Sequence, residues 1–91
     1  MDATASQKDV SVLVVDDEPD LRTLYELALV REGYQVVAAG DLAQAWERLA
    51  AQRFDVVIID MRLPDGLGTS LLQRLREQQR RERCVVITAY G

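Results

Sequence analysis

Four short apolar runs recur along the chain, and each has the length of a single β-strand. They cover residues 10–15, 34–39, 54–60 and 84–88. Within them apolar residues follow one another without the polar alternation of a half-exposed strand, as in VVII at 56–59. Such runs are typical of strands that are covered on both faces. The pattern therefore predicts a four-stranded sheet that other elements shield on both sides.

Between the strands, apolar residues recur at helical spacing and predict three helices. The first begins at Pro19, which suits a first helical turn, and ends at Gly33, where a left-handed cap is expected. Asp41 caps the second helix, whose apolar stripe includes Trp46 as a core anchor. The third helix spans residues 69–81. The apolar stripe of the first helix consists of Leu21, Leu24, Tyr25, Ala28 and Leu29.

The resulting order of elements is βαβαβαβ, which indicates an α/β fold. Strands that alternate with helices form a parallel sheet with right-handed crossovers and helices on both faces. Loop 61–68 is expected to be irregular because it contains a proline and two glycines. Residues 1–9 are polar and aperiodic, so we expect a flexible tail ahead of one domain over residues 10–91.

Acidic residues gather where the strands of this sheet end. Asp16 and Asp17 follow the first strand. Asp60 ends the third strand, and Thr88 ends the fourth. In a parallel sheet these ends meet at one edge, where ligands bind. Crowded carboxylates repel unless a cation lies among them. Their oxygens suit Mg²⁺, or Mn²⁺ in its place, whereas a chain with no histidine and one cysteine is poorly equipped for zinc.

The charge balance and the single cysteine restrict the partners and the compartment. With 11 basic and 15 acidic residues the net charge is −4, which argues against direct binding of nucleic acid. The arginines within 74–83 are expected on the outward face of the third helix. Cys84 is interpreted as a small buried hydrophobe of a chain kept under reducing conditions. No apolar run reaches the ~20 residues of a membrane span, so we expect a cytoplasmic protein that does not bind membranes.

Three stretches of the sequence together resemble the receiver domain of two-component response regulators. They are VLVVDDEPDLR, IIDMRLPDGLG and VVITAYG, in this order, and the resemblance covers residues 10–91. The wording DMRLPDG with ITAYG is also similar to receivers of regulators that activate sigma-54 promoters, such as the pilus-gene regulators. The resemblance implies a flavodoxin-like parallel sheet, a sensor histidine kinase as partner, and an output domain or regulated protein outside this chain.

The same resemblance implies a role for each residue at the carboxyl edge of the sheet. Asp60 would accept a phosphoryl group from a phosphohistidine of the kinase. Asp17 would hold Mg²⁺ directly and Asp16 largely through water, while Asp60 and the backbone carbonyl of Arg62 would complete the ligands. Thr88 would be the switch residue whose hydroxyl bonds the phosphate. Because the chain phosphorylates only itself, the resemblance implies a signalling switch and not an enzyme with turnover.

The sequence departs from the receiver pattern after its fourth strand. A receiver carries a lysine and an aromatic switch residue on a fifth strand, whereas the only lysine here is Lys8. We therefore expect an incomplete receiver that lacks one strand and two helices. The fourth strand would then be an open edge, and such edges pair readily with other chains. Dimerisation or strand exchange through residues 84–88 is expected.

Two other classes of function stay open. A Mg²⁺-dependent phosphatase or phosphotransferase would also use an aspartate nucleophile, here Asp60 or Asp16. Such enzymes usually carry a second acid two residues after the nucleophile, whereas Asp60 is followed at that position by Arg62. The third class is a receiver-fold interaction module without phosphorylation. The absent lysine favours this class, and the retention of all the acids opposes it.

Overall fold

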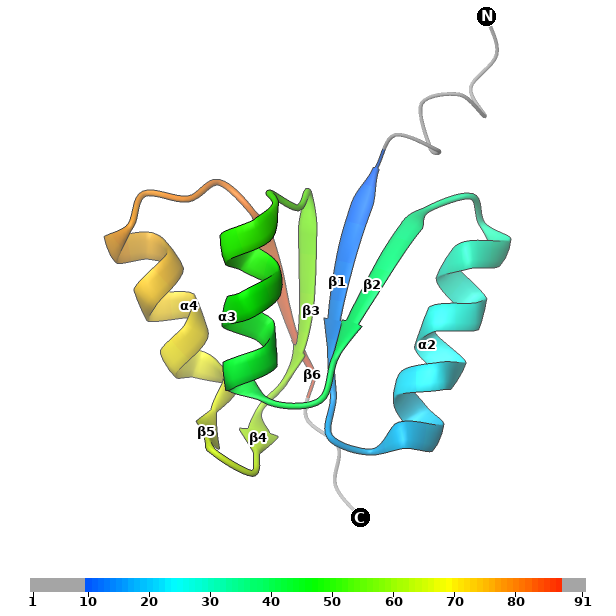
Figure 1. Cartoon of the computed structure of the whole chain (residues 1–91), viewed down its shortest axis with the longest axis horizontal. Coiled ribbons are helices and arrows are strands. Elements are labelled where there is room, and N and C mark those ends of the chain that lie inside the picture. The colour runs from blue at the N-terminus through cyan, green and yellow to red at the C-terminus, as the bar shows by residue number, and fades with distance from the viewer. Residues whose placement is uncertain (1–9, 88–91) are drawn as a thin grey trace, which may run out of the picture.

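The structure, a computed structural model, describes residues 10–87 of the chain (Figure 1). Its main strands are β1 (Ser11–Val15), β2 (Gln35–Ala39), β3 (Val56–Asp60) and β6 (Arg83–Ile87). Its helices are α2 (Pro19–Arg31), α3 (Leu42–Ala51) and α4 (Gly68–Glu77). Two short strands, β4 (Arg62–Leu63) and β5 (Gly66–Leu67), form a separate hairpin. The predicted alternation of strands and helices is confirmed, and the hairpin adds to it.

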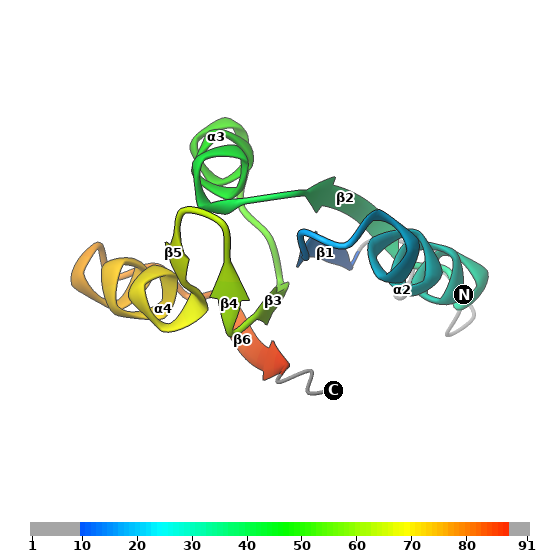
Figure 2. The same cartoon turned by 90° about the horizontal axis from the view of Figure 1, so that it is seen from below.

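The four main strands form one parallel sheet in the order β2-β1-β3-β6. The strand β1 pairs with both β2 and β3, so Val12 lies between Val36 on one side and Val56 on the other. The helix α2 lies on one face of the sheet, and α3 and α4 lie on the other face (Figure 2). This arrangement is the parallel α/β sheet that the pattern predicts and the flavodoxin-like fold that the resemblance implies.

The core lies between the sheet and the helices α3 and α4. Its buried residues are Leu13, Val15, Ala39, Ala45, Leu49, Phe54, Val57, Ile59, Leu63, Leu71 and Leu75. Trp46 and Cys84 pack against this cluster but are only partly buried, so they lie at its margin and not inside it as predicted. Burial raises the pKa of the Cys84 thiol, so the thiol stays protonated at neutral pH.

The face of the sheet that carries α2 is covered less completely. No residue of α2 is fully buried, and Leu24 of the predicted stripe is 60% exposed. On β6, Cys84 and Val86 face the core, so the alternation of side chains turns Val85 toward the α2 face. Val85 is 51% exposed. Within residues 10–87, α2 is the single helix on this face of the sheet. The part of this face over β3 and β6 is therefore uncovered (Figure 2).

The predicted helix boundaries at Pro19, Gly33 and Asp41 are confirmed. Pro19 is the first residue of α2, and Gly33 follows its end with φ of 96°, a left-handed conformation that glycine adopts readily. Asp41 caps α3, because its side chain accepts a hydrogen bond from the N–H of Gln44 at 2.8 Å. None of the helices within residues 10–87 combines the length and the apolar character needed to cross a membrane.

Two local predictions are wrong. Residues 61–68 are not irregular, because they contain the hairpin β4–β5 and the first residue of α4. The third helix ends at Glu77 and not at position 81, since Gln79 adopts a φ of 57° that a right-handed helix cannot contain. The arginines after Gln79 therefore do not share a helix face, and the Arg80 side chain is largely buried in an ion pair with Glu82.

Candidate functional site

The candidate site lies at the carboxyl ends of β1 and β3, the two central strands of the sheet. The chain runs from β1 outward to β2, then returns to β3 and continues outward to β6 on the other side. The strand order therefore reverses between β1 and β3, and such a switch point is the usual ligand site of an open parallel sheet. Asp16 and Asp17 directly follow β1, and Asp60 is the last residue of β3.

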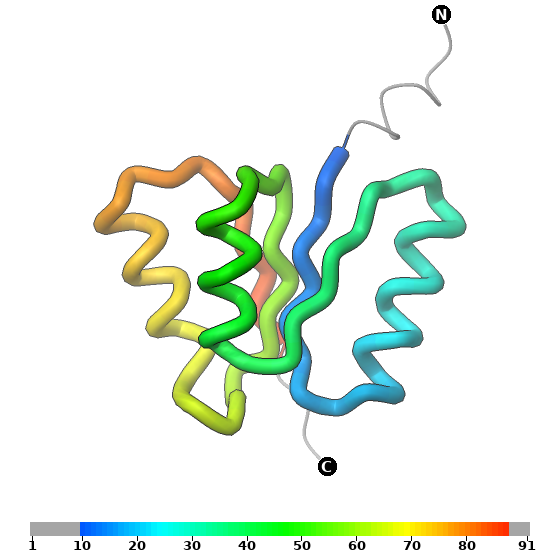
Figure 3. Tube along the Cα trace, in the orientation of Figure 1, coloured from blue at the N-terminus to red at the C-terminus, as the bar shows by residue number. Residues whose placement is uncertain are grey.

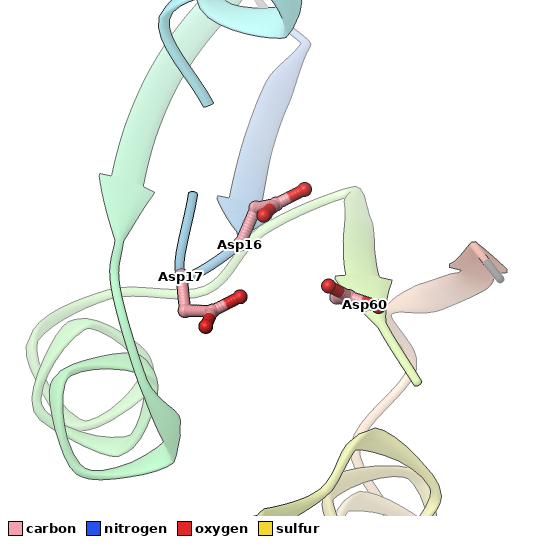
Figure 4. A group of neighbouring side chains, drawn as sticks. All are labelled: Asp16, Asp17 and Asp60. Atoms are coloured by element: carbon pink, nitrogen blue, oxygen red, sulfur yellow. The ribbon is translucent and has the colours of Figure 1, made fainter. Parts of the chain in front are cut away.

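The structure brings the side chains of these three aspartates together. One carboxylate oxygen from each of Asp16, Asp17 and Asp60 lies within 4.8 Å of the other two (Figure 4). Their burial differs: Asp16 is only 3% exposed, Asp60 is half-buried, and Asp17 is exposed. The cluster is thus built on one buried carboxylate, with an opening to solvent through Asp17.

Hydrogen bonds hold the turn from β1 into α2 in place. The Oδ1 atom of Asp16 accepts the N–H of Glu18 at 2.9 Å. The guanidinium of Arg22, on the first turns of α2, donates to the backbone carbonyl of Asp16 at 2.9 Å. Arg22 belongs to the stretch VLVVDDEPDLR, but its role at the site was not predicted, because spacing alone does not say which carbonyl a long side chain reaches.

The electrostatics of the cluster favour a cation. Burial raises the pKa of Asp16, and the nearby charges of Asp60 and Asp17 raise it further, against the opposing effects of the Glu18 N–H and Arg22. A divalent cation among the carboxylates would remove this repulsion. All side-chain donors here are hard oxygens, so the residues fit Mg²⁺ or Mn²⁺.

The hairpin that follows β3 leaves the backbone carbonyl of Arg62 outside its hydrogen-bond ladder. The N–H of Gly68 donates to the carbonyl of Met61 at 2.7 Å, which makes Arg62 and Leu67 a pair without hydrogen bonds to each other. The ladder of the hairpin therefore does not use the carbonyl of Arg62. The N–H of Arg62 points back to Oδ1 of Asp60 at 3.4 Å. The metal role of this carbonyl stays a prediction.

The backbone around Asp60 is tightly packed. The N–H of Met61 donates to the carbonyl of Ile87 at 2.9 Å, which ties the end of β3 to β6. A Cβ atom on Gly68 would collide with the backbone carbonyl of Asp60, so only glycine permits the start of α4 to lie so close. The predicted switch residue Thr88 and the sole lysine, Lys8, lie outside the described residues.

Comparison with known proteins identifies the family. The family model of the response regulator receiver domain matches residues 12–91. With the parallel sheet and the acidic cluster at its switch point, this match shows that the chain belongs to the response regulator receiver domains of two-component systems.

Individual relatives agree with this assignment. The response regulator protein PilR of Pseudomonas aeruginosa is 43% identical over 79 residues, which cover 87% of this chain and 18% of PilR. Sporulation initiation phosphotransferase F of Bacillus subtilis is 34% identical over 80 residues, which cover 88% of this chain and 64% of that protein. Among solved structures, response regulator TrrA of Thermotoga maritima in complex with Mg²⁺-BeF matches with a TM-score of 0.83 at 30% identity, over 90% of this chain and 71% of TrrA.

Proposed function

We propose that this chain is a phosphoacceptor module that takes a phosphoryl group on Asp60 from a sensor histidine kinase, with Mg²⁺ as cofactor. The observation that carries the proposal is the approach of three carboxylates to within 4.8 Å at the switch point of the sheet. A purely structural role does not account for this approach, because like charges at a partly buried position destabilise the fold. The Mg²⁺-BeF complex of the relative TrrA also supports it.

The proposed transfer is a nucleophilic displacement at phosphorus. A carboxylate oxygen of Asp60 attacks the phosphorus of the kinase phosphohistidine, a P–O bond forms, and the P–N bond breaks. The imidazole nitrogen leaves with the bonding electron pair and takes up a proton from solvent. The product is an acyl phosphate on Asp60, formed without another co-reactant.

The neighbouring residues would align the reacting groups. Asp17 would bind the cation directly and Asp16 largely through water, with the carbonyl of Arg62 as a further ligand. Bound there, Mg²⁺ supplies positive charge that neutralises the phosphoryl oxygens. Arg22 holds the backbone of Asp16, and the close packing at Gly68 holds that of Asp60. The nucleophile and the metal ligands are thus positioned before the donor arrives.

We further propose that the acyl phosphate acts as a switch for an output outside this chain. The wording DMRLPDG, shared with the sigma-54 activator class, supports an output in transcription. Phosphorylation would shift the receiver between two conformations, with Thr88 as the switch residue. In this scheme the chain is a cytoplasmic signalling component that is modified once per cycle, and not a phosphatase with turnover.

The proposal is tested by phosphorylation from a small donor. The protein is incubated with Mg²⁺ and acetyl phosphate and weighed by mass spectrometry. We expect one phosphoryl adduct that is absent without Mg²⁺ and absent in Asp60→Asn. The matched control is Asp55→Asn. Asp55 is exposed and directly precedes β3, at the end of the strand opposite Asp60. This variant should leave the adduct intact.

The alternatives give different results in the same experiment. Steady release of inorganic phosphate that requires Asp60 or Asp16 would indicate the phosphatase class. An adduct that persists in Asp60→Asn would contradict Asp60 as the acceptor. A chain that neither binds Mg²⁺ nor forms an adduct would be an interaction module.

We also propose that β6 pairs with a second copy of this chain. Among residues 10–87, β6 has β3 as its one neighbour in the sheet, and its residues from Cys84 to Ile87 are apolar. An apolar edge strand of this kind is a template for intermolecular pairing. Light scattering should show a dimer fraction that grows with concentration and falls in Val85→Lys. A monomer across the whole concentration range would contradict this.

A further inference from the structure

Asp65 lies at the tip of the hairpin β4–β5, and its carboxylate reaches a distant part of the sequence. Its Oδ1 atom accepts the N–H of Leu42 at 2.9 Å, and its Oδ2 atom accepts the N–H of Ala43 at 3.1 Å. Both donors belong to the first turn of α3, whose positive end attracts a carboxylate. Hydrogen bonding to these donors lowers the pKa of Asp65, so the group is charged at neutral pH.

The hairpin depends on such anchors for its position. Each of its strands has two residues, and only Pro64 and Asp65 connect them. A hairpin of this size is not stable by itself in water. Leu63 is buried in the core, and a Cβ on Gly66 would lie only 2.8 Å from the Leu42 side chain, so the hairpin fits closely against the start of α3 (Figure 3).

The other end of the hairpin adjoins the candidate metal site. Arg62 begins β4 two residues after Asp60, and its N–H points to the Asp60 carboxylate. The ladder leaves the Arg62 carbonyl unused, as described above. A displacement of the hairpin tip would therefore move this carbonyl. The strands β4 and β5 have only two residues each, so the tip lies close to Arg62 at the base of the hairpin.

We propose that Asp65 is a positioning residue of the metal site, which ties the hairpin tip to the N-terminus of α3 and so holds the Arg62 carbonyl in place for a divalent cation. This inference rests on the proposed function, since it assigns a structural cause to the affinity of the same site. Asp65 touches neither the cation nor the phosphoryl group, and it acts through the backbone of residues 61–67.

Asp41 provides a matched comparison at the same helix end. Its carboxylate also accepts a backbone N–H of α3, that of Gln44 at 2.8 Å. It directly precedes α3 and does not belong to the hairpin. Replacing Asp41 or Asp65 with alanine removes one negative charge and weakens the capping of the same helix. Only the change at Asp65 also releases the hairpin.

The test measures the affinity of the full chain for Mn²⁺ by electron paramagnetic resonance, in which the free ion gives the signal. Asp65→Ala is expected to raise the Kd about tenfold, the usual size of an effect from a residue that orients a metal ligand. Asp65→Asn keeps one acceptor oxygen and should show a smaller increase. Asp41→Ala should change the Kd by no more than about twofold, although urea unfolding should show that it destabilises the protein as Asp65→Ala does.

The outcomes separate this inference from the proposed function. Equal changes in Kd for Asp65→Ala and Asp41→Ala would overturn the positioning role, because charge and helix capping would then explain both. Wild-type protein that binds no Mn²⁺, or that binds it unchanged after Asp60→Asn, would overturn the proposed metal site itself. If Asp65→Ala does not fold, the comparison of Asp65→Asn with Asp41→Asn decides the question in the same way.

Discussion

A buried carboxylate lies at each end of the strands of the main sheet, at the carboxyl edge and at the amino edge. The surroundings of these two carboxylates shift their pKa in opposite directions. Asp16 lies at the carboxyl edge and is 3% exposed. Glu82 directly precedes β6 at the amino edge, and its side chain is 1% exposed. Burial and neighbouring acids raise the pKa of Asp16, whereas hydrogen bonds to Glu82 outweigh its burial and lower its pKa.

The difference comes from the partners of each group. Two guanidinium nitrogens of Arg80 bond Glu82, at 2.7 and 3.1 Å, and the N–H of Phe54 donates at 3.0 Å. Arg80 also donates to the carbonyls of Leu49 and Gln52 at the end of α3. This network neutralises the charge of Glu82 and joins α3, β3 and β6 at the amino edge.

The carboxyl edge keeps its repulsion instead. Asp17 and Asp60 add negative charge next to Asp16, and the guanidinium of Arg22 bonds the backbone of Asp16 and not a carboxylate. A protein built only for stability would pair or remove these acids. The contrast indicates that the charges at the amino edge stabilise the fold, while the unpaired carboxylates at the carboxyl edge fit the cation site proposed above.

The largest expected effect is at the amino edge. Arg80→Met leaves Glu82 buried without a cationic partner, which should lower the free energy of unfolding by about 3–5 kcal/mol. Urea denaturation followed by circular dichroism measures this change. The exposed neighbour gives the control, since Arg81→Met should alter stability by less than about 0.5 kcal/mol. Similar effects of the two variants would show that the network does not carry the stability assigned to it.

A smaller effect of opposite sign is expected at the carboxyl edge. Asp16→Asn keeps the oxygen that accepts the Glu18 N–H and removes one repelling charge, so it should stabilise the metal-free protein by roughly 1 kcal/mol. Mg²⁺ at about 100 times its Kd should add ~2.7 kcal/mol to the wild type and less to the variant. Thermal unfolding with and without Mg²⁺ measures both. A metal-free variant less stable than the wild type would contradict the claimed repulsion.

The smallest expected effect is the pH dependence of stability, and its sign differs between the edges. The pKa of Glu82 is lower in the folded protein than in the unfolded chain. Glu82 therefore stabilises the fold above the ordinary glutamate pKa, and this stabilisation is lost as the pH falls through the folded pKa. The pKa of Asp16 is higher in the folded protein than in the unfolded chain. Protonated Asp16 therefore stabilises the fold below the ordinary aspartate pKa, and this stabilisation is lost as the pH rises through the folded pKa.

Urea titrations of wild type, Glu82→Gln and Asp16→Asn in metal-free buffer would separate these terms. Glu82→Gln should flatten the stability profile on its acidic side. Asp16→Asn should remove the loss of stability that accompanies rising pH. Carboxylate NMR shifts would check the assignment directly, and a titration of Asp16 below that of an exposed aspartate would contradict it.

Much of the fold and part of the site were predictable from local patterns. Continuous apolar runs predict interior strands, and the caps at Gly33 and Asp41 depend on residues close in sequence. The approach of Asp16, Asp17 and Asp60 also follows from the sequence, because a parallel sheet brings all strand ends to one edge.

The wrong predictions concern two kinds of contact. Some join residues that are distant in sequence, and others join neighbouring residues in a backbone conformation that the sequence pattern did not indicate. The third helix is predicted to reach position 81, yet Arg80 lies outside the helix and bonds Glu82 and the carbonyls of α3. Proline and glycine predicted an irregular loop over 61–68, but this segment contains a hairpin whose two-residue turn, Pro64 and Asp65, lets Asp65 bond α3.

The sequence by itself determined the order of the elements, the parallel sheet and the set of acids at its carboxyl edge, since these depend on periodicity and on strand ends. Only the tertiary structure decided the partners of each carboxylate: which one pairs with an arginine, which one has other carboxylates as neighbours, and which one anchors a hairpin. The reason is that the pKa and the bonds of a carboxylate depend on burial and on partners up to 44 residues away along the chain, which no local pattern specifies.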